Sequence, residues 1–343
     1  MIRADEGLAF LLQYENVAWY TGGAVRILDR RIFPIRTEYV TCKTHQEVAA
    51  AIADMVTQSG GPYLAAAMGM ALAAKECAGQ PGAAQLAYLR AAAHTLAHAR
   101  PTTAAAMREV TGRALARAEA ALAAGHKADE AVFAGAVEDI NNKYLRIEKT
   151  GEALAGLFPA GGTVMTQCFA ETIVGMMLRA CQKSGKQVQV ICPETRPYYQ
   201  GARLTASCVR QMGFPVTVIT DNMPAWVMHQ KKVDVFTSAA DVITMDGHVV
   251  NKVGTLQIAL AARHFGVPYY VTGTPSMAHP GIGTVEMEER DPGQVLQSLG
   301  VKTVLEGVRG YYPAFDVTPP GLCSGVVTDK GVFLPDKLEL YYA

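Results

Sequence analysis

Residues 187–220 have the sequence QVQVICPETRPYYQGARLTASCVRQMGFPVTVIT, in which two short apolar runs flank a longer segment. The runs 187–192 and 215–220 are rich in valine and isoleucine, which predicts buried strands, and residues 200–212 predict a helix between them. The alternation continues outward, with strands expected at 163–167, 233–237 and 268–272, and helices at 172–184, 224–230 and 254–265. Repeated strand–helix–strand units predict an α/β fold with a parallel, doubly wound sheet.

The first 150 residues have a different character. Residues 8–14 and 24–29 predict two strands separated by the turn Thr21-Gly22-Gly23. Thr44 and Glu47 have the spacing of a capping box. The alanine-rich region that follows predicts four or five helices, with breaks near residues 60–62, 80–82, 100–101 and 125. Two prolines suit the first turn of a helix, Pro62 and Pro101.

Glycine and proline between residues 151 and 162 predict a hinge, formed by Gly156, Pro159, Gly161 and Gly162. We therefore expect two domains. Residues 1–150 would form a smaller domain with a small β-sheet and a helical bundle, and residues 151–343 would form the domain with the doubly wound sheet.

The composition excludes several classes of protein. Half of the 343 residues are hydrophobic and 18% are charged, which excludes an intrinsically disordered chain. Lys+Arg and Asp+Glu are both 31, so we expect no general binding to nucleic acid or to an acidic membrane. The apolar stretch 64–74 is too short to span a bilayer, and we expect no signal peptide. Seven cysteines without zinc-site spacing predict reduced thiols, a cytoplasmic location and no metal.

Polar or reactive residues follow five consecutive predicted strands. They are Cys168, residues 194–197, residues 221–223, residues 238–241 and residues 273–276. Because the carboxyl ends of parallel strands meet at one edge of a sheet, these residues predict a ligand site there. The sequence contains no G-x-G-x-x-G, Walker A or G-x-S-x-G motif, so dinucleotide-binding, P-loop and serine-hydrolase functions are excluded.

Two of these residues are candidates for proton transfer. Cys168 lies between a predicted strand end and a predicted helix start, where a helix N-terminus lowers the pKa of a thiol and favours thiolate. A buried structural cysteine is an equal alternative. Asp241 follows an apolar strand and three small residues, and a carboxyl in such a poorly solvated setting can act as acid or base. The alternative for Asp241 is a helix cap or turn residue.

Three further residues are candidates for anion binding. Asn251 and Lys252 directly precede the helix expected at 254–265 and could hold a phosphate near its N-terminus. Their alternative is a surface hairpin. Arg100, before Pro101, could reach an anion from the other domain, and its alternative is a solvated charge at the end of a helix.

Several motifs occur together and in order over nearly the whole chain. They include Pro193-Glu194-Thr195-Arg196-Pro197, Gln200-Gly201-Ala202-Arg203-Leu204-Thr205-Ala206, Ile219-Thr220-Asp221-Asn222-Met223, Ala239-Ala240-Asp241, Asn251-Lys252-Val253-Gly254-Thr255 and residues 313–319. This set resembles the methylthioribose-1-phosphate isomerase family. Its superfamily includes ribose-1,5-bisphosphate isomerase and the regulatory subunits of the translation-initiation guanine-exchange factor.

The resemblance implies a Rossmann-like C-terminal domain with a small N-terminal β and helical domain, usually in a homodimer. It implies conversion of an aldose 1-phosphate, a sugar phosphate of methionine salvage, into the ketose 1-phosphate without metal or organic cofactor. Cys168 and Asp241 would be the catalytic pair. The positions that match substrate and phosphate binding are Arg100, Gln200, Asn251 and Lys252, with Gly60 and Gly61 in a phosphate-gripping loop.

Two departures from the family pattern concern the phosphate. Ser59 occupies the place of an arginine, and Glu171 adds a negative charge near a helix start in a loop that is shorter after Cys168. At ~1.5–3 kcal/mol for a hydrogen bond to a charged group, these changes could cost several kcal/mol of phosphate affinity. The alternatives are therefore a paralogous isomerase for another sugar with altered phosphate recognition, or a non-catalytic regulatory protein of the translation-factor branch.

Overall fold

The computed structural model describes residues 3–100, 104–230 and 233–343 of the chain. It divides into two compact units, Met1–Leu145 and Arg146–Ala343, called unit 1 and unit 2 below. The division falls inside helix α5 (Ala128–Gly156), so the helical region expected to end near residue 150 continues for about two more turns. Gly151 lies in this helix because a Cβ there would come within 2.7 Å of the Met176 carbonyl carbon.

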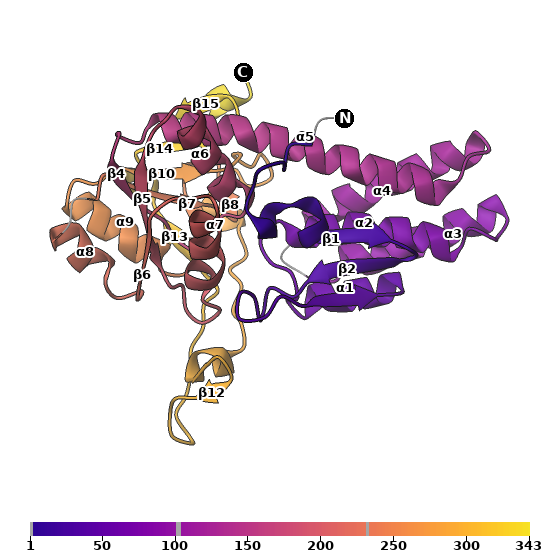
Figure 1. Ribbon diagram of the computed structural model, residues 1–343, viewed down its shortest axis with the longest axis horizontal. Helices are drawn as coiled ribbons and strands as arrows, with labels where there is room; N and C mark the ends of the chain where they lie inside the picture. The colour runs from indigo at the N-terminus through magenta and orange to yellow at the C-terminus, as the bar shows by residue number, and fades with distance from the viewer. Residues whose placement is uncertain (1–2, 101–103, 231–232) are drawn as a thin grey trace. The chain divides into compact units, whose positions relative to one another are not determined.

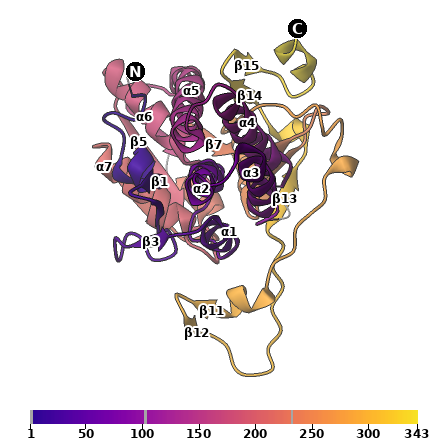
Figure 2. The ribbon, with the colours of Figure 1, turned by 90° about the vertical axis from the view of Figure 1, so that its right-hand side faces the viewer.

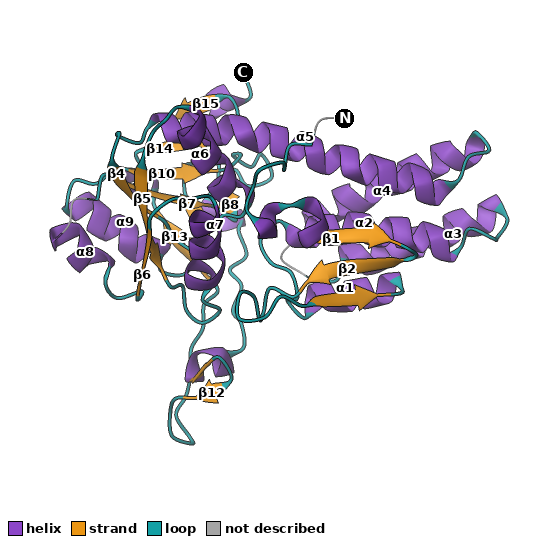
Figure 3. Cartoon of the chain, in the orientation of Figure 1, coloured by secondary structure: helices purple, strands orange, loops and turns teal. Residues whose placement is uncertain are grey.

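Unit 1 contains a small antiparallel sheet and helices (Figure 3). Strands β1 (Ala18–Thr21), β2 (Ala24–Leu28) and β3 (Tyr39–Cys42) pair in this order. The predicted turn is confirmed, since Gly22 and Gly23 join β1 to β2 with φ of +59° and +79°. The strand predicted at 8–14 is wrong: residues 10–12 and 14–16 form 3-10 turns. Neighbouring Leu11 and Leu12 are both buried there, which an alternating strand does not allow.

The helices of unit 1 begin and end close to the predicted breaks. They are α1 (His45–Ala53), α2 (Gly61–Glu76), α3 (Gly82–Ala97), α4 (Ala104–Ala123) and the first part of α5. The N-cap half of the capping box is confirmed, since Thr44 Oγ1 accepts a hydrogen bond from Glu47 N at 3.2 Å, whereas Glu47 Oε2 accepts from Lys43 N at 2.6 Å instead of from Thr44 N. Pro62 lies in the first turn of α2, whereas Pro101 lies outside the described residues.

Unit 2 is built on the predicted parallel sheet. Its seven strands have the order β15-β14-β10-β7-β4-β5-β6. The parallel strands are β4 (Gly162–Met165), β5 (Val188–Pro193), β6 (Val216–Ile219), β7 (Val235–Ala239), β10 (Tyr269–Thr272) and β14 (Gly325–Thr328). Only the edge strand β15 (Gly331–Phe333) is antiparallel among the described residues of this sheet.

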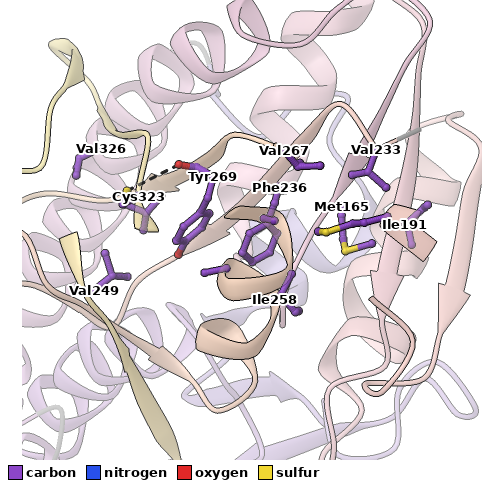
Figure 4. Packing of buried hydrophobic residues seen from close by; sticks show 14 of the residues in the cluster. Met165, Ile191, Val233, Phe236, Val249, Ile258, Val267, Tyr269, Cys323 and Val326 are labelled. Atoms are coloured by element: carbon purple, nitrogen blue, oxygen red, sulfur yellow. Dashed lines mark hydrogen bonds between the residues drawn. The ribbon is translucent and has the colours of Figure 1, made fainter. Parts of the chain in front are cut away.

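Helices cover both faces of this sheet, as expected for a doubly wound fold. Helices α6 (Thr172–Lys183) and α7 (Ala206–Gln211) lie on one face, and α8 (Pro224–Gln230) and α9 (Thr255–His264) lie on the other (Figure 1). The core between the sheet and α9 includes Phe236 and Tyr269, whose rings stack at 4.4 Å (Figure 4).

The single helix predicted at 200–212 differs from the structure. Residues Gly201–Thr205 form a π-helical turn before α7 begins. The chain passes so close to β5 that a Cβ on Gly201 would lie 1.8 Å from the Pro193 carbonyl oxygen. This close approach is the physical reason for the wider turn.

Two smaller sheets complete unit 2. Strands β8 (Val242–Ile243), β9 (Val249–Lys252) and β13 (Phe315–Thr318) form an antiparallel sheet, and a turn at Asp246-Gly247 joins β8 to β9. Strands β11 (Gln297–Ser298) and β12 (Val301–Lys302) form a hairpin on an arm that extends from unit 2 (Figure 2). Short 3-10 turns occur at Ile282–Thr284, Pro292–Leu296, Pro320–Leu322 and Leu338–Tyr341. Within the described ranges, no helix has the length and apolar character needed to cross a membrane.

Candidate active site

Cys168 lies in the loop between β4 and α6, at the carboxyl end of the sheet. Its backbone N–H donates to Thr195 Oγ1 at 3.2 Å, and its carbonyl oxygen accepts from Thr205 Oγ1 at 2.5 Å. Three non-glycine residues here have positive φ: Cys168 at +58°, Glu171 at +52° and Thr195 at +63°. Such conformations are unfavourable, above all for β-branched threonine, and persist only where neighbouring groups hold them.

The Cys168 thiol is held in its neutral form. Burial raises its pKa to about 11, which the positive charge of Lys252 opposes and Asp241 and Asp221 reinforce. The expectation of a thiolate was therefore wrong, because desolvation outweighs the effect of a helix that begins only at Thr172. The other six cysteines are fully buried, so Cys168 alone keeps partial exposure.

Lys252 ends β9 and is 5% exposed. Its Nζ donates to Tyr312 Oη at 3.4 Å and lies 4.9 Å from the ring centre of Phe315. The Arg290 guanidinium also lies near the Phe315 ring, 5.8 Å from its centre. We call these four residues the Lys252 cluster: Lys252, Tyr312, Phe315 and Arg290. Burial lowers the pKa of Lys252, while Cys168 and Asp241 act to raise it. Among the described residues no carboxylate forms an ion pair with Lys252, so a buried amine whose pKa is lowered by desolvation lies at the site.

The alternative of a surface hairpin is wrong for Asn251 as well, which is 5% exposed and donates from Nδ2 to Thr255 Oγ1 at 3.0 Å. That a phosphate binds near the N-terminus of α9 stays a prediction, and two of the amide donors there are in use. Asp316 Oδ2 accepts hydrogen bonds from Gly254 N at 2.7 Å and Leu256 N at 3.1 Å, so a carboxylate already occupies these donors. Burial raises the pKa of Asp316 to about 6.

Asp241 lies between β7 and β8, where its backbone N–H donates to Val250 O at 2.9 Å. Its side chain is exposed, so the expectation of a poorly solvated carboxyl was wrong. A turn residue at the end of β7 remains in contact with solvent even though the strand is buried. Its charge nevertheless acts on both Cys168 and Lys252, which places the three groups at the same edge of the sheet.

The loop after β5 brings a further predicted residue to this edge. Thr195 N and Arg196 N both donate to the Asp221 carboxylate at 2.7 Å, which fixes the loop. Gln200 follows the loop and is 5% exposed, and its Oε1 has no hydrogen-bond partner among the described residues. A buried acceptor of this kind is suited to a ligand hydroxyl.

A small cavity borders Cys168. Polar side chains form one part of its wall and apolar side chains the other; the lining residues are Leu154, Thr166, Gln167, Cys168, Ala170, Ile173, Val174, Met177, Thr205, Thr237, Ser238 and Thr272. Gln167 Oε1 and Thr237 Oγ1 are buried without a hydrogen-bond partner in the described part of the chain. The cavity therefore offers unused polar groups beside the thiol.

The remaining predicted site residues belong to unit 1. They are Arg100, Gly60 and Gly61, and their part in the site stays a prediction. Gly61 has a packing role within unit 1, because a Cβ there would lie 1.8 Å from Thr57 Oγ1. Ser59 has φ of +58°.

Sequence reasoning missed several groups of this site. Arg290 and Tyr312 lie on opposite sides of the base of the arm and Phe315 begins β13, and none of the three follows a predicted strand end. Gln167 precedes Cys168 directly, so its place at the strand end was a usable indication. No group of three or more His, Cys, Asp or Glu that could hold a metal ion occurs within residues 3–100, 104–230 and 233–343.

Known proteins share both sequence and fold with this chain. The sequence profile of the initiation factor 2 subunit family matches residues 59–335. The methylthioribose-1-phosphate isomerase of Chloroflexus aurantiacus is 37% identical over 94% of this chain and 96% of its own. The enzyme of the same name from Thermotoga maritima is 34% identical over 94% of this chain and 96% of its own.

Two solved structures confirm the α/β fold class. The 5-methylthioribose 1-phosphate isomerase of Pyrococcus horikoshii has a TM-score of 0.82 at 29% identity, covering 95% of this chain and 94% of that one. The translation initiation factor eIF-2B, subunit delta, from A. fulgidus has a TM-score of 0.80 at 30% identity, covering 93% and 96%. The chain therefore belongs to the initiation factor 2 subunit family and is an isomerase of that family.

Proposed function

We propose that the chain converts a 5-substituted ribose 1-phosphate, of the S-methyl-5-thioribose 1-phosphate type, into the ribulose 1-phosphate. Cys168 and Asp241 would transfer the protons. The observation that carries the proposal is a neutral thiol, with a pKa of about 11, next to the charges of Lys252 and Asp241 at the sheet edge.

The chemistry needs one proton donor and one proton acceptor. The phosphate on C1 locks the sugar in its ring form. The C1–O4 bond must therefore break before a carbonyl group can form at C2. The Cys168 S–H can give its proton to the ring oxygen while the Asp241 carboxylate removes the proton from C2, which leaves an enol phosphate. Loss of the C2 hydroxyl proton and protonation of C1 then give the ketose. No atoms are gained or lost, and no metal or organic cofactor is required.

The surrounding groups support this assignment. The buried amine of Lys252, when protonated, would stabilise negative charge that develops on the substrate more strongly than a solvated lysine does. The Gln200 Oε1 acceptor can hold a sugar hydroxyl. We propose that Asn251, Arg100, Gly60 and Gly61 complete substrate and phosphate binding.

The substrate class also has a second candidate, a sugar whose phosphate is recognised differently or is absent. Glu171 is 6% exposed and lies three residues after Cys168, so its carboxyl belongs to the loop that carries the thiol. The α9 terminus is already occupied by Asp316. The isomerase relatives favour catalysis over regulatory binding, although the eIF-2B subunit delta from A. fulgidus shares the fold.

We further propose a cytoplasmic homodimer, in keeping with seven free thiols. Exposed apolar side chains occur along the arm, namely Leu299, Val301, Leu305, Val308 and Tyr311. A second copy of the chain could cover this surface. Sedimentation of the wild type and of Leu305→Asp tests it: a wild-type dimer that the substitution weakens supports the proposal, and a wild-type monomer contradicts it.

The catalytic proposal is tested by incubating the purified chain with 5-methylthioribose 1-phosphate and following ketose formation by NMR. We expect turnover by the wild type and a loss of at least about a hundredfold for Cys168→Ser and Asp241→Asn, as for removal of a general acid or base. Cys77→Ser is the matched control, because its Sγ faces the Ala74 and Gln85 carbonyls, which can accept a serine hydroxyl. Full activity of Cys168→Ser would exclude the proposed chemistry. Turnover of another ribose derivative only would favour the second candidate substrate.

A further inference from the structure

The arm of unit 2, residues 288–314, makes a polar contact with the loop after β5. Arg196 Nη2 donates to Gln297 O at 2.8 Å and to Val295 O at 3.3 Å. Arg196 Nη1 donates to Tyr199 Oη at 2.5 Å, and this hydroxyl lies 2.6 Å from Ser298 Oγ. One guanidinium and one phenol thus tie the loop to the arm.

The other side of the same loop supports Cys168. The Thr195 hydroxyl accepts from Cys168 N, and the backbone of Thr195 and Arg196 is held by Asp221. A continuous series of hydrogen bonds therefore runs from the arm through Arg196 and Thr195 to the backbone of the proposed catalytic cysteine.

The loop needs such restraint because of its backbone. Thr195 and Tyr199 have φ of +63° and +55° and flank Arg196 on either side. Residues in this region of φ and ψ remain there only when several contacts hold them. Among those contacts, the side chains of Arg196 and Tyr199 link the loop to a distant segment of the chain, about a hundred residues away in sequence, and Arg196 makes two of these hydrogen bonds.

The base of the arm reaches the site at a second point. Residues on its two sides pair, with Arg290 N donating to Tyr312 O at 3.0 Å and Ala314 N donating to Glu288 O at 2.9 Å. Tyr312 contacts Lys252 through its hydroxyl. The arm therefore touches the proposed site both at the Lys252 cluster and, through Arg196, at the Cys168 loop.

We propose that Arg196 is a positioning residue, which couples the arm to the geometry of the Cys168 loop. This inference rests on the proposed function only for its kinetic readout. Arg196 does not touch the reacting atoms; it acts by holding Thr195, and Thr195 holds the Cys168 backbone. A change in the arm is then transmitted to the thiol.

The test combines hydrogen exchange with kinetics on the full chain. We compare Arg196→Met with Arg196→Lys and with Arg309→Met, an exposed arginine on the same arm. In Arg196→Met, amide exchange should rise about tenfold or more in peptides covering 194–200, 293–299 and 166–170, since charge-assisted hydrogen bonds are lost. The rate constant kcat should fall by a similar factor, and more than KM rises. Arg196→Lys should recover part of both effects, and Arg309→Met should match the wild type.

An exchange increase confined to 293–299, or a lower melting temperature with unchanged kcat, would show that Arg196 only anchors the arm, and would overturn the proposal. If Arg196→Met does not fold, Ser298→Ala removes only the link between Tyr199 and Ser298, and Tyr199→Phe removes that link together with the hydrogen bond from Arg196 Nη1. Both should raise exchange at 166–170 by a smaller factor, and no change in either variant overturns the proposal. If the wild type does not turn over the test sugar, the proposed substrate fails, while the exchange at 166–170 still decides the coupling.

Discussion

The neutral state of the Cys168 thiol has a direct consequence for its reactivity. Its pKa of about 11, against an ordinary value of 9.0, corresponds to ~2.7 kcal/mol and to about a hundredfold less thiolate at pH 8. Because alkylating agents react with thiolate, Cys168 should react about a hundredfold more slowly than an unperturbed thiol at this pH. Lys252 opposes the effect of burial, so Lys252→Met should slow the reaction further.

The rate of iodoacetamide labelling at pH 7–11, followed by mass spectrometry of the Cys168 peptide, measures this prediction. Cys168→Ser provides the blank, and Lys252→Arg, which keeps the positive charge, should react more nearly like the wild type. The labelling rate of the wild type should still be rising at pH 10. A rate that reaches its plateau below pH 8 would refute the argument, since it would show a thiolate that burial does not suppress and would remove Cys168 as a neutral proton donor.

Two further predictions concern the stability and the shape of the site. Burial raises the pKa of Asp316 from 3.8 to about 6, so protonation of this carboxyl favours the folded state. This contribution to the free energy of unfolding is complete below pH 3.8 and is lost as the pH rises through 6. The loss amounts to up to about 3 kcal/mol. Asp316→Asn keeps an oxygen for the α9 amides and should reduce this decline in urea unfolding between pH 4 and 7, and an unchanged pH dependence would contradict the assignment. Gly201→Ala would place a methyl group 1.8 Å from the Pro193 carbonyl oxygen. We therefore expect the free energy of unfolding, measured by thermal unfolding, to fall by about 1–3 kcal/mol and kcat to fall as well. The control Gly156→Ala has open space at its Cβ position and should leave both quantities nearly unchanged.

Most of the secondary structure of unit 2 could be predicted because its buried strands and helices have distinct hydrophobic patterns. The edge of the sheet where Cys168, Asp241 and Gln200 lie also followed from the pattern, since parallel strands end together. The strand predicted at 8–14 failed because short apolar runs do not distinguish a strand from 3-10 turns. The helix at 200–212 differed because the close approach of Gly201 to β5 is a tertiary contact.

The charge state of the site could not be predicted from the sequence. The thiolate expected from the helix position and the buried carboxyl expected at Asp241 were both wrong, because the ionisation of a group depends on the solvent and charges around it. Those surroundings come from segments far apart in the chain. Tyr312 and Phe315 meet Lys252 only because β13 pairs with β9, and Asp316 reaches the α9 amides for the same reason.

The amino-acid sequence by itself therefore determined the order of strands and helices and the presence of Cys168 at the carboxyl edge of the sheet. Only the tertiary structure decided that this thiol is protonated, that the Lys252 amine is buried among aromatic rings, and that the arm is tied to the cysteine loop through Arg196. The reason is physical: hydrophobic periodicity is a local property of the chain, whereas desolvation and long-range hydrogen bonds exist only after distant segments have packed together.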